Sequence, residues 1–140
     1  MTKTLTTIIA VLILTAWMIG CGASLPPPKE VVDNAADLRA QVGQARDDYE
    51  SVKALALPAL SYAAAVPEYA RAAELARTAL ATAPHLLTAA DVAVYQYQHL
   101  GAAYEDTVRA VLEVEHAVAT LHDLVAPLRR AYDAASGAGP

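Results

Sequence analysis

The stretch VVDNAADLRAQVGQARDDYESVKALALPA, residues 31–59, places an apolar side chain at every third or fourth position. The positions concerned are Val31, Ala35, Leu38, Val42, Ala45, Tyr49, Val52, Ala56 and Ala59. Alternating steps of four and three residues put them on one stripe of an α-helix, as in coiled coils and helical bundles. The stretch therefore predicts a long amphipathic helix that packs against another helix.

The composition of the chain favours helix beyond this stretch as well. A length of 140 residues suits one domain, and alanine, the strongest helix former, is the commonest residue. The formal net charge is −5, whereas nucleic-acid binding requires a basic surface. The sequence therefore predicts a single all-α domain without a nucleic-acid partner.

Two further apolar stripes follow. The first consists of Val66, Tyr69, Ala73, Ala76 and Leu80. The second consists of Val94, Tyr97, Gly101, Tyr104, Val108, Val111, Val114, Val118, Leu121, Val125, Leu128 and Tyr132. Two steps of three adjoin at Val108, Val111 and Val114, and a slip of this kind locally overwinds a coiled coil.

Prolines are the main candidates for the ends and bends of these helices. Pro84 lies in APHLLT, residues 83–88, where Thr88 is expected to begin a new helix as a capping box with Asp91. Pro58 and Pro67 enclose a stretch that has none of the glycine, asparagine or aspartate residues typical of reversals. The sequence therefore predicts a turn at APHLLT and kinks at Pro58 and Pro67.

These elements favour an elongated helical hairpin with arms at residues 29–83 and 88–134, the first of them kinked by proline. The alternative treats residues 58–67 as a true reversal and gives a three-helix antiparallel bundle. Both place a helical domain at residues 29–135 and a disordered tail at residues 136–140.

Several leucines lie beside the predicted stripes. They are Leu55, Leu57, Leu60, Leu75, Leu100 and Leu112. A two-helix hairpin buries only one stripe per helix, so a third helix or another molecule must cover them. The hairpin therefore predicts self-association or a protein partner that binds through helical faces.

The beginning of the chain has a different character. Lys3 precedes an uncharged run at residues 5–20, which is shorter than the roughly 20 apolar residues of a membrane-spanning helix. Its length is typical of the core of a signal peptide. Three prolines, Pro26 to Pro28, then separate this run from the helical region.

Met18-Ile19-Gly20-Cys21, at the end of that run, resembles the lipobox of bacterial lipoproteins. The resemblance implies a signal peptide at residues 1–20, cleavage between Gly20 and Cys21, and fatty acyl chains on Cys21. Residues 21–28 would then be the lipidated cysteine and a Gly/Pro tether. Because glycine, and not aspartate, follows the cysteine, the resemblance implies a periplasm-facing anchor in the outer membrane of a host with two membranes.

One pair of residues is a weak candidate for metal binding. Glu113 and His116 form a Glu-x-x-His step, which di-iron carboxylate bundles use twice together with two further glutamates. The chain contains one such step, so a solvated polar face is the favoured interpretation. The lone cysteine and the serines lie in no nucleophile motif, and the chain lacks a glycine-rich phosphate loop. The sequence therefore predicts no enzyme and no cofactor.

The stretch from Tyr97 to Tyr104 resembles the first helix of a tetratricopeptide repeat, with tyrosine in place of tryptophan. The leading hypothesis remains a membrane-anchored helical lipoprotein with a structural, adaptor or partner-binding role. The alternatives are a ligand- or metal-binding helical bundle and a tetratricopeptide-like peptide-binding module.

Overall fold

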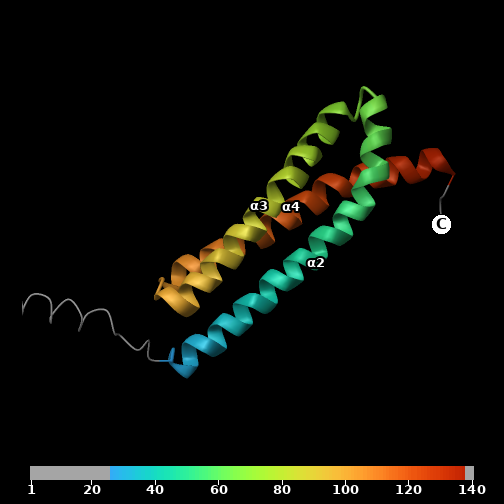
Figure 1. Ribbon diagram of the computed structural model, residues 1–140. Coiled ribbons are helices and arrows are strands. Elements are labelled where there is room, and N and C mark those ends of the chain that lie inside the picture. Colours follow the sequence, from blue (N-terminus) through green and yellow to red (C-terminus); the bar gives the residue numbers. More distant parts are fainter. Residues whose placement is uncertain (1–25, 138–140) are drawn as a thin grey trace, which may run out of the picture.

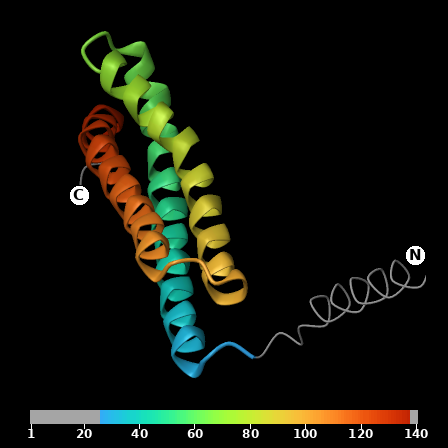
Figure 2. The ribbon, with the colours of Figure 1, turned by 90° about the vertical axis from the view of Figure 1, so that its left-hand side faces the viewer.

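The computed structural model describes residues 26–137, which form three long helices packed side by side (Figure 1). The helices are α2 (Lys29–Ala65), α3 (Ala70–Leu100) and α4 (Tyr104–Ser136). Figure 2 shows that α2 and α4 run in the same direction and α3 in the opposite one. The all-α prediction and the three-helix antiparallel bundle are confirmed. The predicted signal peptide, the lipobox and the end of the predicted tail lie outside the described residues.

One stripe on each helix forms the core, and each stripe keeps an unbroken spacing of three and four residues. In α2 the buried residues at this spacing are Ala35, Leu38, Val42, Ala45, Tyr49, Val52, Ala56, Ala59 and Ala63. In α3 the stripe is Ala73, Ala76, Leu80, Ala83, Leu87, Ala90, Val94 and Tyr97. In α4 it is Thr107, Val111, Val114, Val118, Leu121, Val125, Leu128 and Tyr132. The first of these stripes is the one that the opening stretch predicts.

The preferred hairpin is wrong, because the chain reverses direction between Ala65 and Ala70. A proline disfavours helical geometry in the residue before it. Val66, which precedes Pro67, is accordingly extended, with φ −107° and ψ 112°. The Tyr69 N–H donates to the Val66 carbonyl at 3.0 Å and closes the turn. The steric effect of Pro67 produces this reversal without glycine, asparagine or aspartate.

The predicted turn at residues 83–88 is also wrong, because α3 continues through Pro84. A proline in a helix leaves the carbonyl four residues earlier without its N–H donor. Here that carbonyl belongs to Leu80, and the Tyr49 hydroxyl donates to it at 3.1 Å. The Pro84 ring itself is exposed. Thr88 caps no helix, since its hydroxyl donates to the Pro84 carbonyl at 2.9 Å.

The second reversal lies between Leu100 and Tyr104. Gly101 ends α3 in the left-handed conformation, with φ 71°, and its N–H donates to the Gln96 carbonyl. Gly101 and Tyr104 were predicted in the core stripe, but both are exposed. The reversal predicted at residues 83–88 therefore lies instead between Leu100 and Tyr104.

The predicted slip in the last stripe does not occur. Thr107, and not Val108, occupies the position before Val111, and this restores the alternation of four and three. Thr107 is 1% exposed. Its hydroxyl contacts the Ala103 carbonyl at 3.1 Å and the Ala93 carbonyl at 3.5 Å. A polar side chain can hold a core position here because its own hydrogen bonds are satisfied.

Pro58 lies inside α2, and the helix bends in its C-terminal part, drawn in green in Figure 1. The bend agrees with the kink that the sequence predicts at Pro58. The predicted kink at Pro67 is instead part of the reversal described above.

Replacing Gly43 and Gly101 by alanine is expected to change the unfolding free energy in opposite directions, because Gly43 lies in a helix and Gly101 in a reversal. Gly43 lies inside α2, and a Cβ there would meet nothing within 4 Å, so Gly43→Ala is expected to stabilise the bundle by about 0.5–1 kcal/mol. Gly101→Ala is expected to destabilise it by about 1 kcal/mol, because alanine is strained at positive φ. Urea unfolding of the protein from Gly22 onward measures both. Effects of the same sign would contradict the assignment of the reversal to Gly101.

A second test concerns the carbonyl that Pro84 leaves free. Tyr49→Phe removes its donor and is expected to cost about 1 kcal/mol of unfolding free energy. In a Pro84→Ala background the new N–H of residue 84 supplies a donor, so the cost should fall below about 0.5 kcal/mol. Pro127→Ala, which alters the other end of the bundle, serves as the control background and should leave the cost of Tyr49→Phe unchanged. Equal costs in all backgrounds would show that the hydroxyl does not compensate for the proline.

Candidate functional site

The three helix–helix seams of the bundle differ in chemistry. Positions that flank the core stripes on the α3–α4 side carry only alanine and leucine. They are Ala72, Ala79, Leu86 and Ala93 of α3, and Ala110, Ala117, Leu124 and Ala131 of α4. All are half-buried, and such small apolar side chains let two helices approach closely. The α3–α4 seam is therefore an apolar contact without charged groups at its edge.

Polar contacts cross the α2–α3 seam, which also holds a smaller hollow of about 330 Å³ lined from both helices, with Arg46 and Lys53 at its edge. Arg46 forms an ion pair with Asp91, and Arg39 donates a hydrogen bond to Gln98. Both members of the Arg46–Asp91 pair are about half exposed, and exposed pairs of this kind contribute little free energy. These contacts nevertheless place long side chains across part of the seam.

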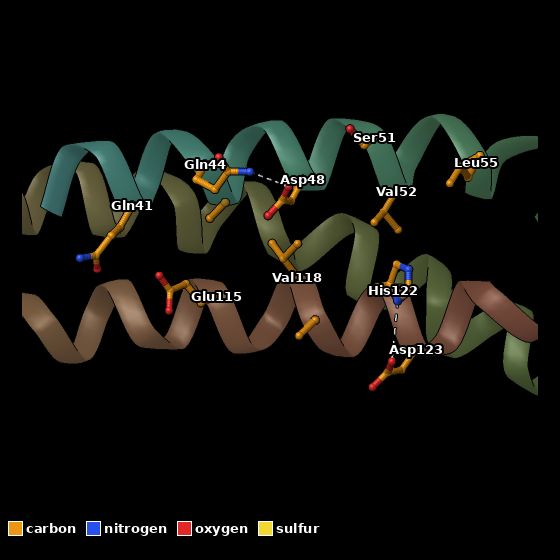
Figure 3. Close-up of a pocket in the computed structure, with 12 residues that line it drawn as sticks. Gln41, Gln44, Asp48, Ser51, Val52, Leu55, Glu115, Val118, His122 and Asp123 are labelled. Atoms are coloured by element: carbon orange, nitrogen blue, oxygen red, sulfur yellow. Dashed lines mark hydrogen bonds and ion pairs between the residues drawn. The ribbon is translucent and has the colours of Figure 1, made fainter. Parts of the chain in front are cut away.

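The α2–α4 seam is open along its middle, and we call this opening the α2–α4 groove (Figure 3). It has a volume of about 650 Å³. From α2 it is lined by Gln41, Gln44, Ala45, Asp48, Ser51, Val52 and Leu55. From α4 it is lined by Glu115, Val118, Ala119, His122 and Asp123.

The floor of the groove is apolar. Ala45, Val52 and Val118 are core residues whose side chains reach its base. Ala119 is exposed beside them, and Leu55 is 47% exposed at one end. The groove therefore offers apolar surface that the bundle itself leaves uncovered.

The rim of the groove is polar and acidic. It carries the carboxylates of Asp48, Glu115 and Asp123, and no lysine or arginine is among the residues that line it. Each polar contact drawn in Figure 3 joins two residues of the same helix. In α2, Gln44 donates to Asp48 at 2.9 Å. In α4, His122 Nδ1 lies 3.8 Å from Asp123 Oδ1. In the described part of the chain, no side-chain hydrogen bond or ion pair joins α2 to α4.

Aromatic side chains close the same seam beyond the groove. The rings of Tyr62 and Tyr132 meet edge to face, with centroids 6.1 Å apart. The Arg129 guanidinium lies 5.5 Å from the centre of the Tyr132 ring and pairs with Asp133 at 2.9 Å. Hydrogen bonding to Asp133 raises the pKa of the Arg129 guanidinium. The seam is thus closed by aromatic side chains beyond the Leu55 end of the groove.

The candidate metal step does not lie in the groove. Glu113 and His116 are both exposed on the outer face of α4, whereas Glu115 and His122 line the groove. Within residues 26–137, no cluster of three or more His, Cys, Asp or Glu side chains could hold a metal ion. Glu113 and His116 therefore have no third donor in that part of the chain. Gly20 and Cys21, the predicted cleavage and lipidation residues, lie outside it.

The tetratricopeptide-like stretch does not form one helix. Tyr97 is buried near the end of α3, and Tyr104 begins α4 on the other side of the reversal. Their ring centroids lie 5.5 Å apart across the loop. The two tyrosines therefore join two helices, whereas the repeat pattern requires them on the same helix.

The bundle leaves most of the unassigned leucines uncovered. Leu60 is buried, at 5% exposure. The others are between 47% and 69% exposed, and they are Leu55, Leu57, Leu75, Leu100 and Leu112. Leu55 is the one of these five that lines the α2–α4 groove, and exposed apolar surface beside a groove often marks an interaction site.

A matched pair of leucines in α2 tests this division. Leu60→Ser is expected to destabilise the bundle by about 3 kcal/mol, because it removes buried apolar surface and buries a hydroxyl. Leu55→Ser, in the groove wall, should change the unfolding free energy by less than about 0.5 kcal/mol. Thermal unfolding followed by circular dichroism measures both. A large loss for Leu55→Ser would mean that Leu55 serves folding and not an exposed site.

No described helix is both long enough and apolar enough to cross a membrane. Comparisons with protein-family models, with curated proteins and with solved structures give no match.

Proposed function

We propose that the chain is a membrane-anchored bacterial lipoprotein whose helical bundle acts as a non-enzymatic adaptor in the cell envelope. The observation that carries the partner-binding role is the exposure of Leu55, Leu57, Leu75, Leu100 and Leu112 on a bundle whose core is complete without them. Exposed apolar groups of this size cost solubility, and a bound partner would remove that cost. The anchor rests on the lipobox-like Met18-Ile19-Gly20-Cys21.

The proposed anchor gives the bundle a direction. The start of α2 and the α3–α4 loop lie at one end of the bundle, and the α2–α3 turn lies at the other (Figure 2). α2 has 37 residues and therefore a length of about 55 Å. An anchor at Cys21 makes the α3–α4 loop the end nearest the membrane, with the groove farther out. In a host with two membranes we place the anchor in the outer membrane, with the bundle in the periplasm.

Lipid attachment is the form of membrane binding that suits this charge balance. With a net charge of −5, the chain has no electrostatic attraction to anionic lipid headgroups. Two or three acyl chains bind a bilayer far more firmly than one. The proposed modification at Cys21 would therefore supply the membrane affinity by itself.

Metabolic labelling tests the anchor. Cys21→Ser is expected to abolish incorporation of labelled fatty acid and to release the protein from the membrane fraction of a bacterial host. A second variant, Cys21→Ser with Ser24→Cys, keeps one cysteine but places it outside the lipobox-like stretch, and it should remain unlabelled as well. Undiminished fatty-acid labelling of the Cys21→Ser variant would rule out Cys21 as the site of lipidation.

Photocrosslinking in cells tests the adaptor role. A photoreactive residue replaces Leu55, Leu75 or Leu100 in turn, with Asp47 on the charged outer face of α2 as the control position. A protein adduct at one or more of the leucine positions, and none at Asp47, is expected. Absence of adducts at all three leucine positions would contradict a partner-binding role.

A further inference from the structure

We infer that the α2–α4 groove binds an amphipathic helix that carries lysine or arginine beside its apolar stripe. The inference rests on the adaptor function proposed above and names the chemistry of its partner. It combines three properties of the groove: its length, its apolar floor and the sign of the charges on its rim.

The length of the groove suits a short helix. Its lining on α2 extends from Gln41 to Leu55, a rise of about 21 Å, or nearly four helical turns. The groove is bounded on one side by α2 and on the other by α4, as Figure 3 shows. A helix laid between two helices completes a four-helix arrangement, in which the new helix buries a single stripe.

The floor of the groove suits the apolar stripe of such a helix. Ala45 and Ala119 are small and allow a partner backbone to approach closely, while Leu55 offers a large exposed side chain at one end. Helices that bind in grooves do so through apolar residues at positions i, i+3, i+4 and i+7. On α2 the groove is edged at the same spacing, by Gln41, Gln44, Asp48, Ser51 and Leu55.

The rim of the groove selects the charge of the occupant. Asp48, Glu115 and Asp123 surround the apolar floor, and the lining contains no lysine or arginine. His122, the one basic side chain among the lining residues, lies 3.8 Å from Asp123. The α2–α3 seam differs, because Arg46 there is already paired with Asp91. Basic residues on an incoming helix would complement the three carboxylates, whereas acidic residues would be repelled. A second copy of this chain, with a net charge of −5, is disfavoured for the same reason.

A designed peptide serves as the probe. It is an amidated helix of about four turns with leucine at positions i, i+3, i+4 and i+7 of each repeat and lysine at the remaining positions. Its twin carries glutamate in place of every lysine. Fluorescence anisotropy with the full mature chain is expected to show saturable 1:1 binding of the lysine peptide and no binding of the glutamate peptide at concentrations up to about 100 μM.

Matched charge variants locate the binding. Asp48→Lys, Glu115→Lys and Asp123→Lys together are expected to weaken binding of the lysine peptide by at least about tenfold. The control combines Asp47→Lys, Glu74→Lys and Glu113→Lys, which are exposed and do not line the groove. It changes the net charge by the same amount and should weaken binding less than about threefold. Circular dichroism verifies that both variants remain folded, and Leu55→Ser supplies an independent groove variant that should also bind less tightly.

Several outcomes would overturn the inference. They are failure of the lysine peptide to bind, equal weakening by the groove and control variants, and sedimentation showing that the groove is filled by a second copy. The photocrosslinking positions separate this failure from failure of the proposed function. Adducts at Leu75 or Leu100 without any at Leu55 leave the adaptor role intact and exclude the groove, whereas absence of adducts at every position excludes the adaptor role itself.

Discussion

Burial of one stripe per helix, spaced alternately by three and four residues, is the constraint on which the rest of the structure depends. The opposite face of each helix is polar and exposed to solvent, so the apolar stripes can be buried only against one another. The stripes of α2 and the first half of α3 are rich in alanine, whereas α4 contributes the large, fully buried Leu121 and Leu128. Small side chains opposite large ones fill a thin core at close helix approach. Because each helix contributes a single stripe, a break in any one of them would open the core.

That constraint explains how the helices tolerate residues that ordinarily break them. α3 continues through Pro84 because the helical spacing keeps Ala83 and Leu87 buried in the core. The Tyr49 hydroxyl donates to the Leu80 carbonyl, which the proline leaves without its backbone donor. Thr107 holds a core position because its hydroxyl bonds to backbone carbonyls. In the part of the chain that the structure describes, no buried side-chain polar atom lacks a hydrogen-bond partner. Core packing therefore decides where the helices continue. Local hydrogen bonds offset the free-energy cost of leaving buried polar groups without a partner.

The same packing leaves the three seams chemically unequal, and this inequality supports the functional proposals. Alanine and leucine close the α3–α4 seam, and paired side chains such as Arg46 and Asp91 cross the α2–α3 seam, whose smaller hollow has Arg46 and Lys53 at its edge. The α2–α4 seam retains apolar surface beneath three carboxylates that no lysine or arginine of the groove lining pairs with. An adaptor needs a stable scaffold and a surface that the scaffold does not use. The bundle would be the scaffold and the α2–α4 groove the unused surface. The lipobox-like stretch would provide the attachment to a membrane.

The sequence by itself determined the all-α class and the buried stripe of α2, because the spacing of apolar residues along one helix is a local property. It did not determine which prolines reverse the chain: Pro58 and Pro84 lie inside helices, whereas Pro67 ends one. A usable signal was present, since Ala83, Leu87 and Ala90 continue the stripe across the predicted turn. Only the tertiary structure decided that Glu115 and His122, and not Glu113 and His116, border an open seam. The physical reason is that exposure depends on which helix lies alongside, and the periodicity of one helix does not contain the position of its neighbour.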